Sequence, residues 1–234
     1  MTNKLQKQFD TKQILLFLTF FIFVIEILFR ILIRCIPITE DIPNYIEWLI
    51  SASIRMISVA FVIKIAMQWK GNTQINWGLK SKNLKIDLLL SLPFILIGTL
   101  ILSLYHFNTW QIRHLIAPIA NQPSNIQLFS WIIAGVIIAP ICEEILFRSI
   151  FFNALMHYFK GKNWWKITLS SSISSVTFAT LHITSLSLSG FQSAIIPFIC
   201  GLFGCVFFQW RKNIFTATIV HSFANLYLFI LAYI

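Results

Sequence analysis

Apolar stretches of about 20 residues recur along the whole chain, and no other sequence feature constrains the fold as strongly. A helix rises about 1.5 Å per residue, so such a stretch crosses roughly 30 Å of hydrocarbon. Of the 234 residues, 57% are hydrophobic and 11% are charged, which leaves no segment suited to a soluble domain. The pattern predicts an all-α, polytopic bundle of membrane helices.

Polar interruptions divide the sequence into about seven predicted transmembrane helices. Their expected bounds are 13–35, 45–69, 86–106, 127–158, 164–186, 192–210 and 214–234. The first has no small-residue cleavage site and is expected to remain as an anchor. The fourth contains Pro140, which predicts a kink or a break there. The segment 108–120 is too short to span and is predicted to lie at the interface.

Lysines and arginines gather in alternate connections between the predicted helices, before the first and after the second, fourth and sixth. Because cytoplasmic connections carry such an excess, we expect a multi-pass protein of the cell membrane with its amino terminus inside and its carboxyl terminus outside. The net charge of +10 comes from these short clusters. It therefore favours anionic lipid headgroups, and not nucleic acid, as the partner.

Ionisable residues inside the predicted spans are functional candidates, because each costs at least about 2.5 kcal/mol near the bilayer centre. One set has a structural explanation. Glu26, Arg30 and Arg34 stack on one helix face as an ion-paired group. Arg55 and Lys64 are interpreted as snorkelling side chains, or as a counter-charge for Glu26. We place neither Arg55 nor Lys64 in the site.

The fourth span carries a different set, the adjacent Glu143 and Glu144 with Arg148 four residues after the second. Glu144 and Arg148 lie one helical turn apart and are predicted to pair, which leaves Glu143 to face elsewhere. A carboxylate placed in this way is suited to general base catalysis.

Two later spans add Phe178 with His182, and His221 with Asn225. His221 and Asn225 are one turn apart and share a helix face. Polar groups without partners are expensive in apolar helices. We therefore expect both histidines, the amide and the acidic pair to meet in one polar pocket between the helices.

The small residues and the cysteines of the predicted spans are the remaining residues to interpret. The small residues Ser170 to Ser172, Ser174, Ser175, Gly201 and Gly204 are interpreted as sites of close helix packing. The cysteines have no ligand spacing and are interpreted as structural: Cys35, Cys142, Cys200 and Cys205. Cys142 stays open as an alternative nucleophile, since it adjoins the glutamates.

The three groups form an ordered set: Glu143-Glu144-x-x-x-Arg148, Phe178-x-x-x-His182 and His221-x-x-x-Asn225. This set resembles the three motifs of the CAAX protease and bacteriocin-processing family, also called the Abi family. The resemblance divides the chain into a variable region of three spans, 1–125, and a catalytic core of four spans, 126–234. In the first region, Trp77-Gly78-Leu79 resembles a loop often seen in the family.

The resemblance implies an intramembrane glutamic endopeptidase, similar to the enzymes that remove the last three residues from prenylated CAAX proteins. It implies that Glu143 and His182 activate a water for attack on the scissile carbonyl. His221 and Asn225 would stabilise the oxyanion. The supporting residues that it implies are Glu144, Arg148 and Phe178. The expected substrate is a peptide or a protein tail, with or without a lipid, and no cofactor is expected.

The residues leave three alternatives open. Glu143, His182 and His221 could bind a zinc ion with water in an open position, although the chain has no HExxH motif. The same motifs could serve bacteriocin self-immunity or regulation by binding, roles that the family also contains. A proton-coupled transporter would also place carboxylates and histidines in a bundle, but no inverted repeat supports it.

Overall fold

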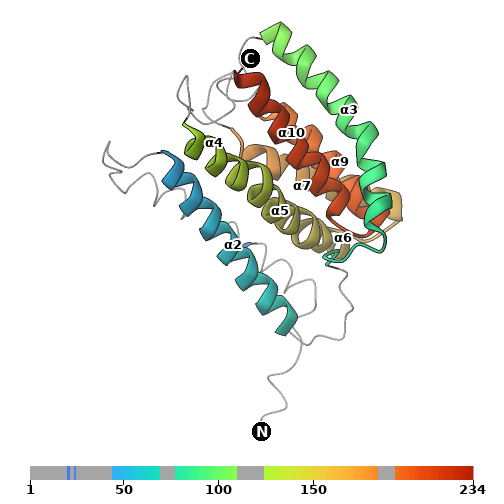
Figure 1. The fold of residues 1–234 in the computed structure, drawn as a ribbon. Coiled ribbons are helices and arrows are strands. Elements are labelled where there is room, and N and C mark those ends of the chain that lie inside the picture. The colour runs from blue at the N-terminus through green and yellow to red at the C-terminus, as the bar shows by residue number, and fades with distance from the viewer. Residues whose placement is uncertain are drawn as a thin grey trace.

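The computed structural model describes residues 20, 21, 24, 44–68, 77–109, 124–183 and 193–233, and its regular elements in these ranges are all helices (Figure 1). The helices are α2 (Asn44–Gln68), α3 (Leu84–Thr109), α4 (Asn125–Trp131), η2 (Ile132–Ile138), α5 (Ala139–Glu144), η3 (Ile145–Phe152), α6 (Asn153–Tyr158), α7 (Asn163–Thr180), α9 (Ile195–Arg211) and α10 (Phe215–Tyr233). The predicted first span and the predicted interfacial segment lie almost entirely outside the described residues. The expected seven crossings therefore stay a prediction.

The elements from α4 to α6 form one continuous helix, 125–158, in which two stretches are π-helical. The sequence predicted a kink or a break at Pro140, and the helix does not break there. Pro140 lies in the first turn of α5, directly after the π-helical η2, where its missing N–H falls at a change of hydrogen-bond pattern. Short π-helical turns within α-helices are frequent at functional sites. Here η2 and η3 flank α5, which carries both glutamates.

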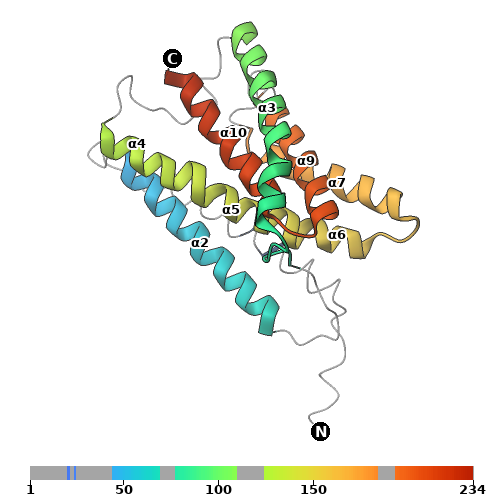
Figure 2. The same cartoon turned by 45° about the vertical axis from the view of Figure 1, so that its right-hand side comes forward.

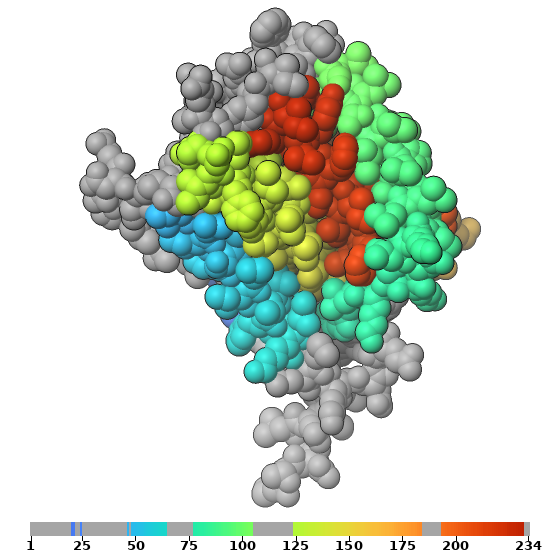
Figure 3. Space-filling view, viewed as in Figure 1, coloured from blue at the N-terminus to red at the C-terminus, as the bar shows by residue number. Residues whose placement is uncertain are grey.

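The position of α10 brings the motifs together (Figures 1 and 2). It lies between α3 and the long helix, and it also contacts α9, which packs on α7. The hydroxyls of Ser103 on α3 and Tyr227 on α10 lie 2.5 Å apart. On the other side of the long helix, α2 runs along α4, η2 and α5, as the space-filling view shows (Figure 3). His221 and Asn225 on α10 therefore face the helix that carries the glutamates.

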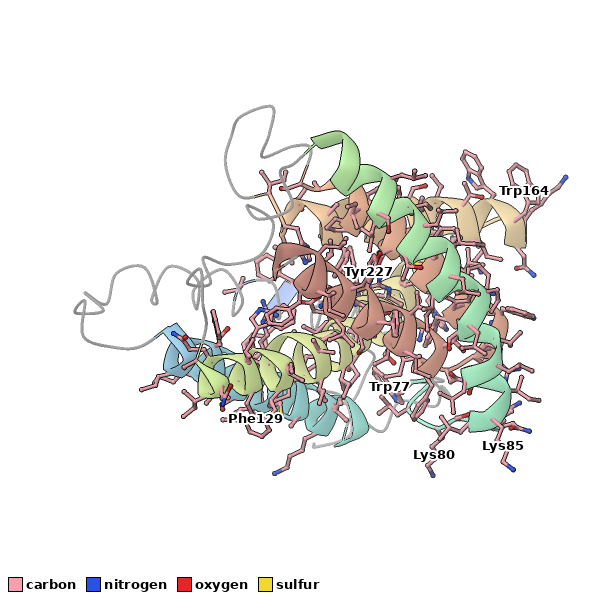
Figure 4. The ribbon with its side chains drawn as sticks, turned by 45° about the horizontal axis from the view of Figure 1, so that its top comes forward. Trp77, Lys80, Lys85, Phe129, Trp164 and Tyr227 are labelled. Carbon is pink, nitrogen blue, oxygen red and sulfur yellow. The ribbon has the colours of Figure 1, made fainter. Side chains whose placement is uncertain are left out.

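The outer surface of the described helices is apolar, as lipid contact requires. Leucines of α3 recur along one side and are 52–69% exposed: Leu89, Leu92, Leu96, Leu100 and Leu104. By length and composition, 84–104 and 125–158 are able to cross a membrane, whereas α9 and α10 are apolar but shorter. Lys80, Lys85 and Trp164 point away from the bundle, the lysines beside the start of α3 (Figure 4).

Helix α7 ends earlier than the sequence predicted. It stops at Thr180, six residues before the expected bound of 186, so His182 lies in a turn and not inside the helix. The backbone N–H groups of His182 and Ile183 bond to carbonyls three residues earlier, which tightens the chain at the helix end. The hydroxyl of Thr180 donates to the carbonyl of Thr177 over 2.8 Å, and such a hydroxyl competes with helical hydrogen bonds.

Candidate active site

A buried ion pair on the long helix forms the centre of the candidate site. Glu144 and Arg148 are each 1% exposed, and Arg148 Nε lies 2.9 Å from Glu144 Oε2. The two groups are in close contact, but their angles are not those of an aligned hydrogen bond. The helical spacing predicted this pair, and the structure confirms it.

The guanidinium of Arg148 is fixed by neighbours on two other helices. Its Cζ atom lies 4.7 Å from the centroid of the Phe178 ring, within the range of a cation–π contact. Its Nη2 donates to the carbonyl of Cys200 over 3.5 Å. A Cβ atom at Gly204 would come within 2.5 Å of Arg148 Nε. Gly204, predicted to serve helix packing, thus makes room for a buried charge.

His221 lies between the two glutamates. Its Nδ1 is 3.0 Å from Glu144 Oε1, and its Nε2 is 3.7 Å from Glu143 Oε2. Because a carboxylate oxygen accepts, Nδ1 donates to Glu144, and this bond turns Nε2 toward Glu143. The ring also packs edge-on against Phe178, with 5.7 Å between centroids. Phe178 therefore contacts both His221 and Arg148.

Both motif histidines and the motif asparagine line one cavity of about 120 Å³ between α7, α9 and α10. The Nδ1 atom of His182 lies 2.8 Å from the carbonyl oxygen of Phe178. Since a carbonyl only accepts, Nδ1 carries the proton, and Nε2 is the acceptor of the neutral ring. Asn225 donates one amide N–H to the carbonyl of Gly135 over 2.9 Å, and an amide has two such donors.

Glu143 pairs with a residue from the first half of the chain. Arg55 Nη1 on α2 lies 2.8 Å from Glu143 Oε1, and the side chains are 20% and 13% exposed. Arg55 therefore pairs with Glu143, and the interpretation of it as a snorkelling side chain was wrong; the alternative partner, Glu26, lies outside the described residues. The one sequence signal for Arg55 was its charge within an apolar helix, and no motif spacing connects it to Glu143.

Within the ranges that the structure describes, no three His, Cys, Asp or Glu side chains are arranged to hold a metal ion. Cys142 is 3% exposed and belongs to the apolar core, and Cys200 and Cys205 are also free thiols. Cys35 lies outside the described residues.

A second cavity, of about 200 Å³, lies between α3, α9 and α10. Its walls are almost entirely apolar and include Phe94, Leu102 and Phe203. It shares Ile196, Cys200, His221 and Ala224 with the first cavity. An apolar space therefore adjoins the polar one at His221.

Sequence reasoning missed one further buried charge, Asp87 at the start of α3. We call Asp87 and its four donors the Asp87 cluster; the donors are Ser81, Arg211, Asn213 and Thr216. The aspartate is 0% exposed, and Arg211 Nε lies 2.6 Å from its Oδ1. The cluster joins the start of α3 to the connection between α9 and α10. An aspartate in the first turn of an apolar helix was the available signal.

Comparison with known proteins adds independent support for the family that the motifs predicted. Residues 125–227 match the family described as type II CAAX prenyl endopeptidase Rce1-like. A stretch of 89 residues is 27% identical to the membrane-embedded CAAX protease MroQ of Staphylococcus aureus (strain USA300). This stretch covers 38% of the chain and 34% of MroQ, so the match spans about a third of that relative's length. No solved structure matches the chain.

The matched residues contain all three motifs, from the glutamate pair to Asn225. The family and the apolar helices place the protein in a membrane, as the composition predicted. The comparisons therefore support the assignment to the CAAX protease and bacteriocin-processing family that the motifs predicted.

Proposed function

We propose that this protein is an intramembrane endopeptidase in which Glu143 and His182 activate a water for peptide-bond hydrolysis. One observation carries the proposal: His221 lies between the two glutamates and also lines the cavity that contains His182 and Asn225. Two imidazoles and an amide thus line one space, and the Glu143 carboxylate, which is not among the lining residues, adjoins it through His221. Structural pairing alone would not require a cavity beside them.

In the proposed reaction, one set of groups accepts a proton from the attacking water, and another set donates hydrogen bonds to the oxyanion. Glu143 Oε2, which lies 3.7 Å from His221, and Nε2 of His182 are the acceptors for a proton from water. The second N–H of Asn225 would donate to the oxyanion that forms on the scissile carbonyl, and so would Nε2 of His221 when the ring carries a proton on both nitrogens. Glu144 would act indirectly, by orienting His221 while it pairs with Arg148.

The proposed substrate is the tail of a protein or a peptide that carries a hydrocarbon group. The matching family is named for prenyl endopeptidases, and the relative MroQ is named a CAAX protease. In this chain, the apolar cavity adjoins the candidate site at His221, which suits a substrate with polar and apolar parts. The mechanism is proposed to need no metal, and chelation of purified protein is expected to leave the cleavage rate unchanged.

The test uses purified protein in liposomes and a quenched fluorescent peptide with a farnesylated CAAX terminus. Glu143→Gln and His182→Ala are expected to lower the cleavage rate by about 10²- to 10⁴-fold. His157→Ala, at an exposed histidine of α6, is the matched control and should not change the rate. Full activity in either motif variant would reject the proposed mechanism.

A second arm tests the function without assuming a substrate. Membrane peptides are compared by mass spectrometry between cells with the intact protein and cells with the Glu143→Gln variant. Fragments found only with the intact protein support a peptidase. If cells are instead protected from a bacteriocin equally by both forms, the protein acts by binding and the peptidase proposal is wrong.

We also propose the sevenfold crossing with a cytoplasmic amino terminus. Two connections predicted to be cytoplasmic meet in the structure: the N–H of Ile214 donates to the carbonyl of Gly78 over 3.0 Å, and Arg211 pairs with Asp87. Cysteines introduced at Lys82 and Lys162 should react with a membrane-impermeant thiol reagent only after cells are opened. Labelling of intact cells at either position would contradict this orientation.

A further inference from the structure

Arg55 occupies a position of α2 where packing requires an apolar side chain. Ala52, Arg55, Val59 and Val62 recur at intervals of three, four and three residues, so they share one face of the helix. Their apolar members are 4% exposed or less, and α2 packs against α4, η2 and α5. The arginine therefore interrupts the stripe that fixes α2 to the long helix.

A permanent charge on such a face needs a compensating partner. Arginine does not lose its proton in proteins, and burial in an apolar helix is costly for it. Lys64, on the same helix, is exposed, so the snorkelling interpretation suits Lys64. Arg55 is half-buried and in contact with Glu143, so that interpretation does not suit it.

The two oxygens of Glu143 have different surroundings. Oε1 contacts Arg55 at 2.8 Å, whereas Oε2 faces His221 at 3.7 Å. The first contact has hydrogen-bond geometry and fixes the rotation of the carboxylate. The second distance is longer than a hydrogen bond, so Oε2 keeps more of its capacity to accept from a water than Oε1 does.

We propose that Arg55 is a positioning residue for Glu143, which holds Oε1 so that Oε2 faces the reacting water. This inference rests on the proposed function. It places one part of the site on α2, outside the residues 125–227 that match the family. A guanidinium has a planar set of donors, whereas an ammonium is a point charge on a shorter side chain, so lysine replaces Arg55 only in part.

The kinetic test uses the same farnesylated peptide and three variants of α2. Arg55→Met is expected to lower kcat by about 100-fold, since small misplacement of a reacting group costs that much, with KM changed less than about threefold. Arg55→Lys should recover part of the loss in kcat. Lys64→Gln, which removes a charge from the same helix, should keep the wild-type kcat. Wild-type kcat in Arg55→Met, or a loss found only in KM, overturns the proposal.

A double-mutant cycle tests the contact without any substrate. Thermal unfolding in detergent is measured for the wild type, Arg55→Met, Glu143→Gln and the double variant. The second substitution should lower Tm much less when the first is already present, because the pair is already broken. Additive shifts in Tm overturn the positioning role and leave the proposed function standing. If the wild type neither cleaves the farnesylated peptide nor produces fragments in the comparison of membrane peptides, the proposed function fails. The positioning role then fails with it.

Discussion

The Asp87 cluster and the glutamate cluster, which we define as Glu143, Glu144, Arg148 and His221, are both buried groups of charges, but their hydrogen bonds differ. Both oxygens of Asp87 accept two bonds each. Arg211 and Thr216 donate to Oδ1, and Ser81 and Asn213 donate to Oδ2. The aspartate therefore has little capacity left for a further partner.

The glutamate cluster is less completely paired. Nη1 of Arg148 is buried and has no hydrogen-bond partner among the residues that the structure describes. The contact between Arg148 and Glu144 is close but not aligned, and Glu143 Oε2 lies 3.7 Å from His221. Incomplete pairing in a buried site costs stability, and it leaves acceptors and donors for water and substrate.

The comparison indicates that one cluster serves mainly the stability of the fold and the other mainly the proposed reaction. A fully satisfied buried network holds one arrangement of its helices and contributes to stability. A cluster with unused hydrogen-bonding capacity beside a cavity is where a reaction has room to occur. We therefore expect substitutions in the Asp87 cluster to change the unfolding free energy, and substitutions at the glutamate cluster and its cavity to change the cleavage rate.

Among the substitutions that test this comparison, the largest effect is expected at Asn225, which lines the cavity. Asn225→Ala should lower kcat by about 10²- to 10³-fold, the cost of losing one donor to an oxyanion. Asn153→Ala is the matched control, because Asn153 also donates its amide to a backbone carbonyl, that of Ser149, at 2.8 Å. Cleavage of the fluorescent peptide measures both. Equal rates in the two variants would remove Asn225 from the reaction.

The next effect is expected in the Asp87 cluster and concerns stability. Asp87→Ala should lower the unfolding free energy by about 3 kcal/mol, at the lower end for a broken buried pair, because Arg211 is 20% exposed and is able to reach water. Denaturation in mixed micelles measures the change. Lys85→Ala, at an exposed neighbour, should stay within about 0.5 kcal/mol of the wild type. If the folded Asp87→Ala protein lost kcat but no stability, the comparison would be reversed.

Sequence spacing predicted the contacts that lie along one helix. Glu144 and Arg148 pair as their four-residue spacing requires, and the long helix and α10 begin within two residues of their expected positions. These predictions succeed because helical geometry alone determines which side chains share a face. The chemistry of the glutamates and histidines was assigned from the motifs, and it stays a prediction.

Contacts between helices were not predictable in the same way. Arg55 and Glu143 are separated by 88 residues, and their contact depends on the rotation and the depth of two helices. In an apolar chain, many rotations bury similar surfaces, so the pattern of hydrophobic residues does not select one. Asp87 was missed for the same reason, since three of its four donors lie 124–129 residues further along the chain. The end of α7 at Thr180 was not predicted either.

A moderate effect is expected from Gly204→Ala, which would overpack the glutamate cluster. The added methyl group would lie 2.5 Å from Arg148 Nε, so the guanidinium or α9 must move, at a cost of about 1–3 kcal/mol in unfolding free energy. Because Arg148 holds Glu144, kcat should fall as well. Gly98→Ala, with no atom within 4 Å, should instead stabilise by about 0.5–1 kcal/mol. A Gly204→Ala protein of normal stability and rate would show that the cluster is not tightly packed.

The smallest effect is expected from Ser81→Ala, and it tests how complete the Asp87 cluster is. Ser81 donates to Asp87 Oδ2, which also accepts from Asn213 at 3.2 Å. Removing one donor of four should cost about 1 kcal/mol, because the carboxylate keeps its ion pair with Arg211. Ser53→Ala, at an exposed hydroxyl that bonds within α2, should change stability by less than about 0.5 kcal/mol. A loss as large as that of Asp87→Ala would mean that Ser81, and not the ion pair, holds the aspartate in place.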